Sequence, residues 1–205
     1  MNEIIVIGAG GHSKSCIDVI EHQGKFKIAG IICNDDKYKN GIGSYGIIGK
    51  DKDLKIIRAK YDKSFVAVGQ IKTSENRKKI YELLKNLNFK LPIIISPRAY
   101  VSKNAEIGEG TIIMHGAVVN AGAVIGNNCI INSKALIEHD STVGNHCHIS
   151  TGALLNGGVT VGENTFVGSG VVVKELIKIE SNCIIGAGST IVKNVKRNST
   201  IIIKQ

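Results

Sequence analysis

The chain has 205 residues and a formal net charge of +9, with 43% apolar residues and no tryptophan. No apolar run approaches the ~20 residues that a membrane-spanning helix needs, which excludes that class. The N-terminus, Met-Asn-Glu, leads at once into an apolar strand pattern, so we predict no signal peptide and a cytoplasmic protein.

The excess of basic residues allows two kinds of partner. Many lysines fall on the exposed faces of predicted helices or at turns, without an aromatic platform or a recognisable nucleic-acid motif. A basic surface equally suits acidic small molecules such as nucleotide sugars. We therefore expect a small anionic substrate and neither a nucleic-acid nor a membrane partner.

The N-terminal part has an α/β pattern. A helix with Ile17, Val19 and Ile20 inward follows the first strand, and another is expected over about residues 73–87. Buried strands are predicted over residues 3–7, 26–33 and 64–68. This order is typical of a short, Rossmann-like βαβ unit of the doubly wound type.

A glycine-rich turn joins the first strand to its helix, with the sequence G-A-G-G-H-S over residues 8–13. Such a turn presents backbone N–H groups to a phosphate at a helix N-terminus. Ser13 replaces the third glycine of the dinucleotide fingerprint, which argues against a dehydrogenase. We predict a nucleotide or nucleotide-sugar pocket instead. The substrate-binding candidates are the loop residues and those that follow the other strands: Gly10, Gly11, His12, Asp35, Asp36 and Gly69.

From Ile95 to Ile191 every sixth residue is Ile, Val or Leu. A second position, four residues after each aliphatic, is mostly small, and only Ile177 is bulky there. A period of six fits neither a helix nor an isolated strand, but it fits a solenoid whose hexads form three flat faces per turn. Three cysteines are separated by whole turns of three hexads and are therefore expected to stack in one buried column: Cys129, Cys147 and Cys183.

Several stretches together resemble a known family. They are G-A-G-G-H-S-K over residues 8–14, V-A-V-G over 66–69, R-K-K-I over 77–80 and N-S-K-A-L-I-E-H-D over 132–140. With the hexads, they are similar to the hexapeptide-repeat bacterial sugar acetyltransferases. That family includes the UDP-4-amino-sugar N-acetyltransferase of bacillosamine synthesis and the sialic acid O-acetyltransferases.

The resemblance implies a left-handed parallel β-helix, acetyl-CoA as co-substrate, and a homotrimer with active sites between adjacent coils. It predicts a nucleotide-sugar domain over residues 1–92. The β-helix domain with a short tail would occupy residues 93–205.

One histidine has the surroundings of a general base. His139 is expected to point outward, and the adjacent carboxylate of Asp140 can orient the ring and raise its basicity. In the family the matching histidine is the general base and its acidic neighbour tunes it. Three hexads make one turn, so Gly157 should lie about one strand spacing (~4.8 Å) above His139. The resemblance gives the Gly157 N–H an oxyanion-type contact with the thioester.

Further roles come from the resemblance. His148 lies half a turn from His139 and matches a histidine that contacts the acetyl donor across a subunit interface; the alternative is an ordinary surface histidine. Ser169 and Ala187 match backbone contacts to coenzyme A. The candidates for neutralising the phosphates of coenzyme A are Lys174, Lys178, Lys193, Lys196 and Arg197. Many relatives end in Gly-x-Pro-Ala-Lys near coenzyme A, whereas this chain ends in N-S-T-I-I-I-K-Q over residues 198–205.

The residues leave four functions open. The first is acetyl transfer to the amine of a nucleotide-linked amino sugar in bacterial surface-glycan synthesis, without a metal. The second is O-acetylation of sialic acid or a related nonulosonic acid, which needs the same base. A zinc-dependent γ-carbonic anhydrase is disfavoured by the gaps of seven and two residues among His139, His146 and His148. A non-catalytic scaffold coil is the fourth.

Overall fold

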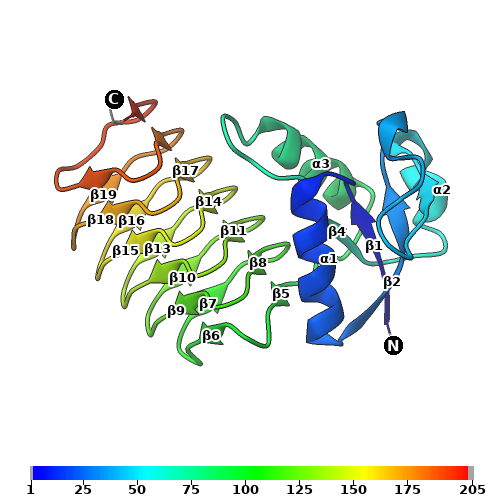
Figure 1. The fold of residues 1–205 in the computed structure, drawn as a ribbon, viewed down its shortest axis with the longest axis horizontal. Coiled ribbons are helices and arrows are strands. Elements are labelled where there is room, and N and C mark those ends of the chain that lie inside the picture. The colour runs from blue at the N-terminus through cyan, green and yellow to red at the C-terminus, as the bar shows by residue number, and fades with distance from the viewer. Residues whose placement is uncertain (1, 203–205) are drawn as a thin grey trace.

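The computed structural model describes residues 2–202, which form an α/β part followed by a long coil of short strands (Figure 1). The α/β part contains a parallel four-stranded sheet with the order β3-β2-β1-β4. Its strands are β1 (Asn2–Ile7), β2 (Phe26–Ile32), β3 (Ile47–Gly49) and β4 (Ser64–Val66). The predicted Rossmann-like unit is confirmed, with two strands ending a little earlier than expected.

Two longer helices belong to the α/β part. Helix α1 (Gly11–Gln23) ends at Gly24, whose φ of 67° lies in the left-handed region that glycine adopts freely. Helix α3 (Glu75–Asn86) is slightly shorter than the predicted helix. The shorter helical segments are α2 (Leu54–Ile57), η1 (Asp36–Tyr38) and η2 (Asp51–Asp53). No helix within residues 2–202 is long and apolar enough to cross a membrane.

The coil is a parallel β-helix with three faces, each named here by its first strand. The β5 face contains β5 (Ile94–Ile95), β8 (Ile112–Ile113), β11 (Ile130–Ile131), β14 (His148–Ile149), β17 (Phe166–Val167), β20 (Ile184–Ile185) and β22 (Thr200–Ile201). The β6 face contains β6 (Tyr100–Val101), β9 (Val118–Val119), β12 (Leu136–Ile137), β15 (Leu154–Leu155), β18 (Val172–Val173) and β21 (Thr190–Ile191). The β7 face contains β7 (Glu106–Ile107), β10 (Val124–Ile125), β13 (Thr142–Val143), β16 (Thr160–Val161) and β19 (Lys178–Ile179).

The strand register follows the hexads. Each strand residue pairs with the residue three hexads later, as Ile131 does with Ile149, and the second residue of each strand points inward. Most of these aliphatics are fully buried, and so is the cysteine column that was predicted. The last turn is shorter by two positions, because Ile179 pairs with Val195 and Ile185 pairs with Ile201. The regular repeat of an aliphatic residue at every sixth position therefore ends where this shortened turn begins.

The β5 face is the one that the α/β part covers. The outward residues of its first strands, Ile94, Ile112 and Ile130, are fully buried because they share one apolar cluster with Cys16, Ile17 and Ile20 of α1. Figure 1 shows α1 lying between the four-stranded sheet and the start of the coil. The two parts thus share a core. The division at residues 92 and 93 stays a prediction.

Arg77 of α3 joins the two parts through backbone carbonyls. It is 1% exposed, and its guanidinium donates to the carbonyls of Val66 and Val68 at the end of β4 and to Asn128 in the coil. Burial lowers the pKa of Arg77 to about 10. No carboxylate within residues 2–202 is within salt-bridge distance of it, so backbone carbonyls carry the compensation for the buried charge.

Replacing Arg77 by Ala should destabilise the fold strongly. The substitution leaves buried carbonyls of both parts without a donor and opens a cavity, so we expect a loss of about 3 kcal/mol in the free energy of unfolding. Urea denaturation measures the change. Lys78→Ala is the matched control on the same helix, since its ion pair with Glu82 is exposed and should contribute less than about 0.5 kcal/mol. Equal losses in the two variants would contradict the assignment.

Candidate active site

His139 and Asp140 form a hydrogen-bonded pair at the corner between the β6 and β7 faces. The turn there places Asp140 at a φ of 59°, which brings its carboxylate beside the preceding ring. The Nδ1 of His139 lies 2.8 Å from Oδ2 of Asp140, and the His139 side chain is 66% exposed. Hydrogen bonding to Asp140 raises the pKa of His139. The carboxylate favours the proton on Nδ1, which leaves Nε2 to accept one from a substrate.

Glu138 stabilises the same corner by accepting two hydrogen bonds. Its Oε2 accepts a hydrogen bond from Asn120 Nδ2 at 2.8 Å and a longer one from the His139 N–H at 3.3 Å. Asn120 lies one full turn before Glu138, so this contact uses the stacking of successive turns. The sequence-based site did not include Asn120, although its position in the column follows from the same arithmetic.

Gly157 is the next residue in the column above His139. A side chain there would collide with the imidazole, because a Cβ on Gly157 would lie 2.6 Å from His139 Nε2. The neighbouring Gly158 N–H donates to the His139 carbonyl at 2.9 Å, which fixes the two turns in this register. Within residues 2–202 the Gly157 N–H has no hydrogen-bond acceptor. A backbone donor without a partner thus lies beside Nε2, as the stacking arithmetic predicted for the position of Gly157.

His148 lies on a different face from His139. It points outward from β14 on the β5 face, yet it is only 7% exposed because the α/β part covers it. Its Nδ1 donates to the Gln70 carbonyl at 2.6 Å, and its Nε2 accepts from Asn132 Nδ2 at 3.1 Å. Burial lowers the pKa of His148 to about 4. The ring is therefore neutral near pH 7, and it is no ordinary surface histidine.

The β5/β6 corner carries the two predicted coenzyme A contacts. Ser169 and Ala187 lie one full turn apart there, and Ser169 Oγ is hydrogen-bonded to Ser150 Oγ at 3.0 Å. Asn132, which bonds His148, lies at the start of the same corner. In one chain the whole β6 face separates this corner from His139.

The predicted substrate residues gather at a second place, the carboxyl ends of β1, β2 and β4. A pocket of about 920 Å³ is lined there by Gly10, Gly11, His12, Asp35 and Gly69. Burial lowers the pKa of His12 to about 3, so this ring too is neutral. Ligands of doubly wound folds bind at this edge of the sheet.

Asp36 and helix α3 differ from the sequence-based expectation for this pocket. Asp36 turns away to pair with Lys50 Nζ at 2.8 Å and is not among the lining residues of the described chain. The opposite wall comes from Asn76, Lys79 and Ile80 of α3. Their spacing of i, i+3 and i+4 defines one helical face, and this is the signal by which the sequence could have revealed them.

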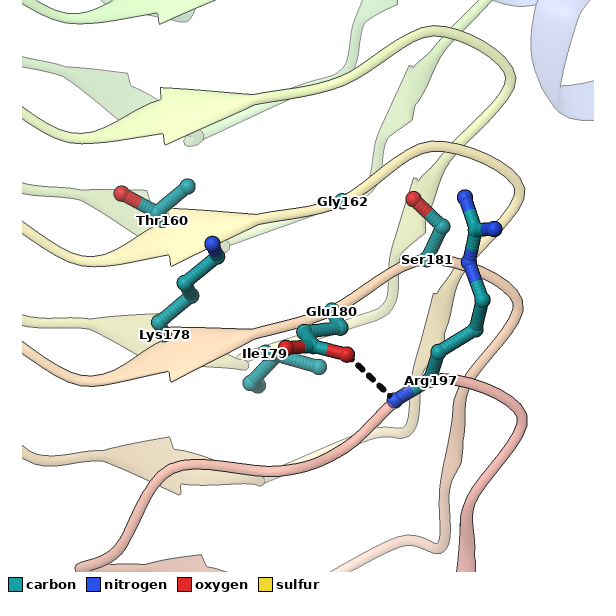
Figure 2. Close-up of a pocket in the computed structure, with 7 residues that line it drawn as sticks. All are labelled: Thr160, Gly162, Lys178, Ile179, Glu180, Ser181 and Arg197. Carbon is teal, nitrogen blue, oxygen red and sulfur yellow. Dashed lines mark hydrogen bonds between the residues drawn. The ribbon is translucent and has the colours of Figure 1, made fainter.

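A third recess, shown in Figure 2, lies at the corner between the β7 and β5 faces. It has a volume of about 220 Å³ and includes Lys178 and Arg197, two of the predicted phosphate partners. Glu180 Oε2 accepts from the Arg197 backbone N–H at 2.8 Å. The structure thus places these two basic residues away from Ser169 and Ala187, which lie at the β5/β6 corner.

Comparison with known proteins finds relatives of both parts of the chain. The profile of the PglD N-terminal domain matches residues 3–84, and the bacterial transferase hexapeptide profile matches overlapping stretches between residues 104 and 193. A UDP-N-acetylbacillosamine N-acetyltransferase from Bacillus subtilis (strain 168) is 36% identical over 117 residues, which is 56% of this chain and about half (52%) of that protein.

Two solved structures match over nearly their whole length. The acetyltransferase domain of PglB from Neisseria gonorrhoeae FA1090 is 33% identical, with a TM-score of 0.89 over 98% of this chain and 96% of that chain. It has also been solved with acetyl coenzyme A. PerB from Caulobacter crescentus, solved with CoA and GDP-perosamine, is 31% identical, with a TM-score of 0.89 over 99% of this chain and 93% of that chain.

The fold and the two matching profiles thus define a hexapeptide-repeat transferase with a PglD-type N-terminal domain. More narrowly, the chain belongs to the hexapeptide-repeat bacterial sugar acetyltransferases, enzymes that use acetyl coenzyme A. Its coil is the left-handed β-helix of that family.

Replacing Gly157 by Ala should impair catalysis without unfolding the protein. The new Cβ would displace the exposed ring of His139, the predicted general base, and a shift of about 1 Å in a catalytic group costs up to ~100-fold in rate. Steady-state kinetics and a thermal melt measure the two effects. Gly46→Ala is the control, because no atom lies within 4 Å of its Cβ position and its φ is not positive. Unchanged turnover in Gly157→Ala would contradict the proximity argument.

Proposed function

We propose that the protein transfers the acetyl group of acetyl-CoA to the amine of a nucleotide-linked amino sugar, in the cytoplasm, during bacterial surface-glycan synthesis. The observation that carries the proposal is the corner where His139, tuned by Asp140, lies beside the unpartnered N–H of Gly157. The glycine-loop pocket supports a nucleotide-linked acceptor, since its volume of about 920 Å³ suits a ligand of that size.

The chemistry follows from these groups. The amine nitrogen attacks the thioester carbon, and His139 Nε2 takes the proton that the nitrogen releases. The carbonyl oxygen becomes negatively charged, and the Gly157 N–H donates a hydrogen bond to it. The C–S bond then breaks, the thiolate leaves as coenzyme A and takes up a proton, and the sugar keeps the acetyl group. Transfer is direct, with no acetylated enzyme.

A homotrimer would complete the site. The outward column of the β6 face is apolar and only partly buried, as Val118, Leu136, Leu154 and Val172 show. If three β6 faces surround a threefold axis, the β6/β7 corner of one chain meets the β5/β6 corner of the next. His139 of one chain would then face His148 and Ser169 of its neighbour. This packing supports the proposal that His148 contacts the acetyl donor across the interface.

The acceptor is tested by thiol release from acetyl-CoA with a panel of sugars. The panel contains UDP-4-amino-4,6-dideoxy sugars, a GDP-4-amino sugar, and free and CMP-linked sialic acid. We expect turnover with one amino sugar and a loss of ~100-fold or more in His139→Ala. Turnover with the sialic acids alone would contradict transfer to an amine and would assign a hydroxyl group as the acceptor. If there is neither turnover nor coenzyme A binding, the proposal fails and a non-catalytic scaffold becomes the favoured function.

Asp140→Asn should move the pH profile of the reaction. The base acts when unprotonated, so the acid limb of kcat/KM follows the pKa of His139, which Asp140 raises. Removing the charge lowers that pKa, and the limb should shift to lower pH while the plateau falls by about 10- to 100-fold. Asparagine tolerates the left-handed turn, so the backbone is kept. A limb that stays in place would exclude His139 as the titrating base.

A further inference from the structure

A cluster of metal-binding side chains lies where α1 meets the coil, apart from the proposed catalytic corner. Asp18 and His22 are four residues apart on α1 and share one helical face. His115 comes from the turn after β8, at the β5/β6 corner of an early turn. One ligand atom of each residue lies within 4.8 Å of the other two.

The carboxylate of Asp18 lies between the two imidazoles. Its Oδ2 is 2.6 Å from His115 Nε2, and its Oδ1 is 3.4 Å from His22 Nδ1. The two rings meet edge to face with centroids 5.5 Å apart. Two imidazoles and one carboxylate from two parts of the fold therefore lie within reach of one ion. The His22 Nδ1 also donates to the Asp18 backbone carbonyl at 2.8 Å, so the exposed His22 ring must turn to offer a lone pair.

A buried hydroxyl orients His115 toward the cluster. Ser96 is 1% exposed, and its Oγ lies 2.6 Å from His115 Nδ1. The same oxygen accepts a hydrogen bond from the Arg98 N–H at 3.0 Å and retains a second lone pair for the histidine. Metal-binding histidines in proteins usually donate their second ring N–H to an oxygen in this manner. In the metal-free structure Nε2 carries the proton that Asp18 Oδ2 accepts, so Nδ1 of a neutral ring accepts from the Ser96 hydroxyl. An ion at Nε2 requires the ring proton to move to Nδ1, where Ser96 Oγ can accept it.

We propose that Asp18, His22 and His115 bind a divalent transition-metal ion such as Zn²⁺, with water in the fourth position. Two histidines and one carboxylate are a common zinc donor set. At bond lengths of ~2.0 Å, tetrahedral ligands lie about 3.3 Å apart, so the contact between Asp18 and His115 must open on binding. Asp18 is half exposed and can turn, and the ion takes the place of the proton that bridges Oδ2 and Nε2.

The bound ion would cross-link the two parts of the molecule. Two ligands belong to α1 and one to the coil, so the ion strengthens the junction that the shared apolar cluster already makes. It takes no part in acetyl transfer, because His139 of the same chain lies at the other edge of the β6 face and His148, which would face His139 across the proposed interface, lies two turns further along the coil than His115. The readouts are therefore binding and stability, not turnover.

The test titrates the metal-free full chain with Co²⁺ and Zn²⁺. Visible Co²⁺ absorption reports tetrahedral binding, and a thermal melt reports stabilisation by mass action. We expect one Zn²⁺ per chain, a higher Tm with Zn²⁺, and an affinity at least about tenfold lower in His22→Gln. His22 is exposed, so this variant should fold and keep the pair between Asp18 and His115.

Cys33→Ser is the matched control, because Cys33 is the one cysteine of the described chain that is not buried. It should bind Co²⁺ and Zn²⁺ as the wild type does. Binding that persists unchanged in His22→Gln would overturn the proposal. A thiolate-to-cobalt absorption band that disappears in Cys33→Ser would overturn it too. So would the absence of saturable binding of either metal up to about 100 μM, because the Kd expected of such a site is lower than this concentration.

Discussion

The closed turn of three hexads is the constraint on which the coil depends. It makes residues one full turn apart direct neighbours, so any corner residue sits against one from the next turn. Gly157 lies beside His139 for this reason, and Asn120 reaches Glu138 in the same way. The geometry of the proposed catalytic corner is thus fixed by strand pairing. It does not depend on a flexible loop that would have to close around the substrate.

The three faces of the coil have different surroundings, and the cover over the β5 face brings the pocket of the α/β part close to the coil. The β5 face is covered by α1, which buries Ile94, Ile112 and, further along, His148. The carbonyl of Gln70, which accepts from His148, belongs to the loop that also contributes Gly69 to the proposed substrate pocket. A substrate bound in that pocket would therefore lie against the backbone that orients His148. Arg77 ties the same loop region to the coil through Val68 and Asn128.

The coil, the glycine loop and the position of Gly157 could be predicted because each rests on a strict local period or on a residue type with few structural uses. Strand β3 could not, since its two isoleucines lie between Gly46 and Gly49 and show no alternation. The direction of Asp36 depends on a distant partner, Lys50, which no local pattern reveals. The burial of His148 has the same cause: it comes from the docking of the α/β part on the β5 face, a contact between segments far apart in sequence.

The shortened last turn has a consequence for solubility. A solenoid with a perfect repeat exposes, at its end, strand edges on which another copy can stack, and such stacking propagates into fibres. Here β22 pairs with β20 out of step with the regular repeat, and Val195 meets Ile179 only as an isolated bridge. A second molecule cannot continue all three faces from this uneven rim. Within the described residues, the irregularity therefore interrupts the regular strand edges on which a further turn could stack.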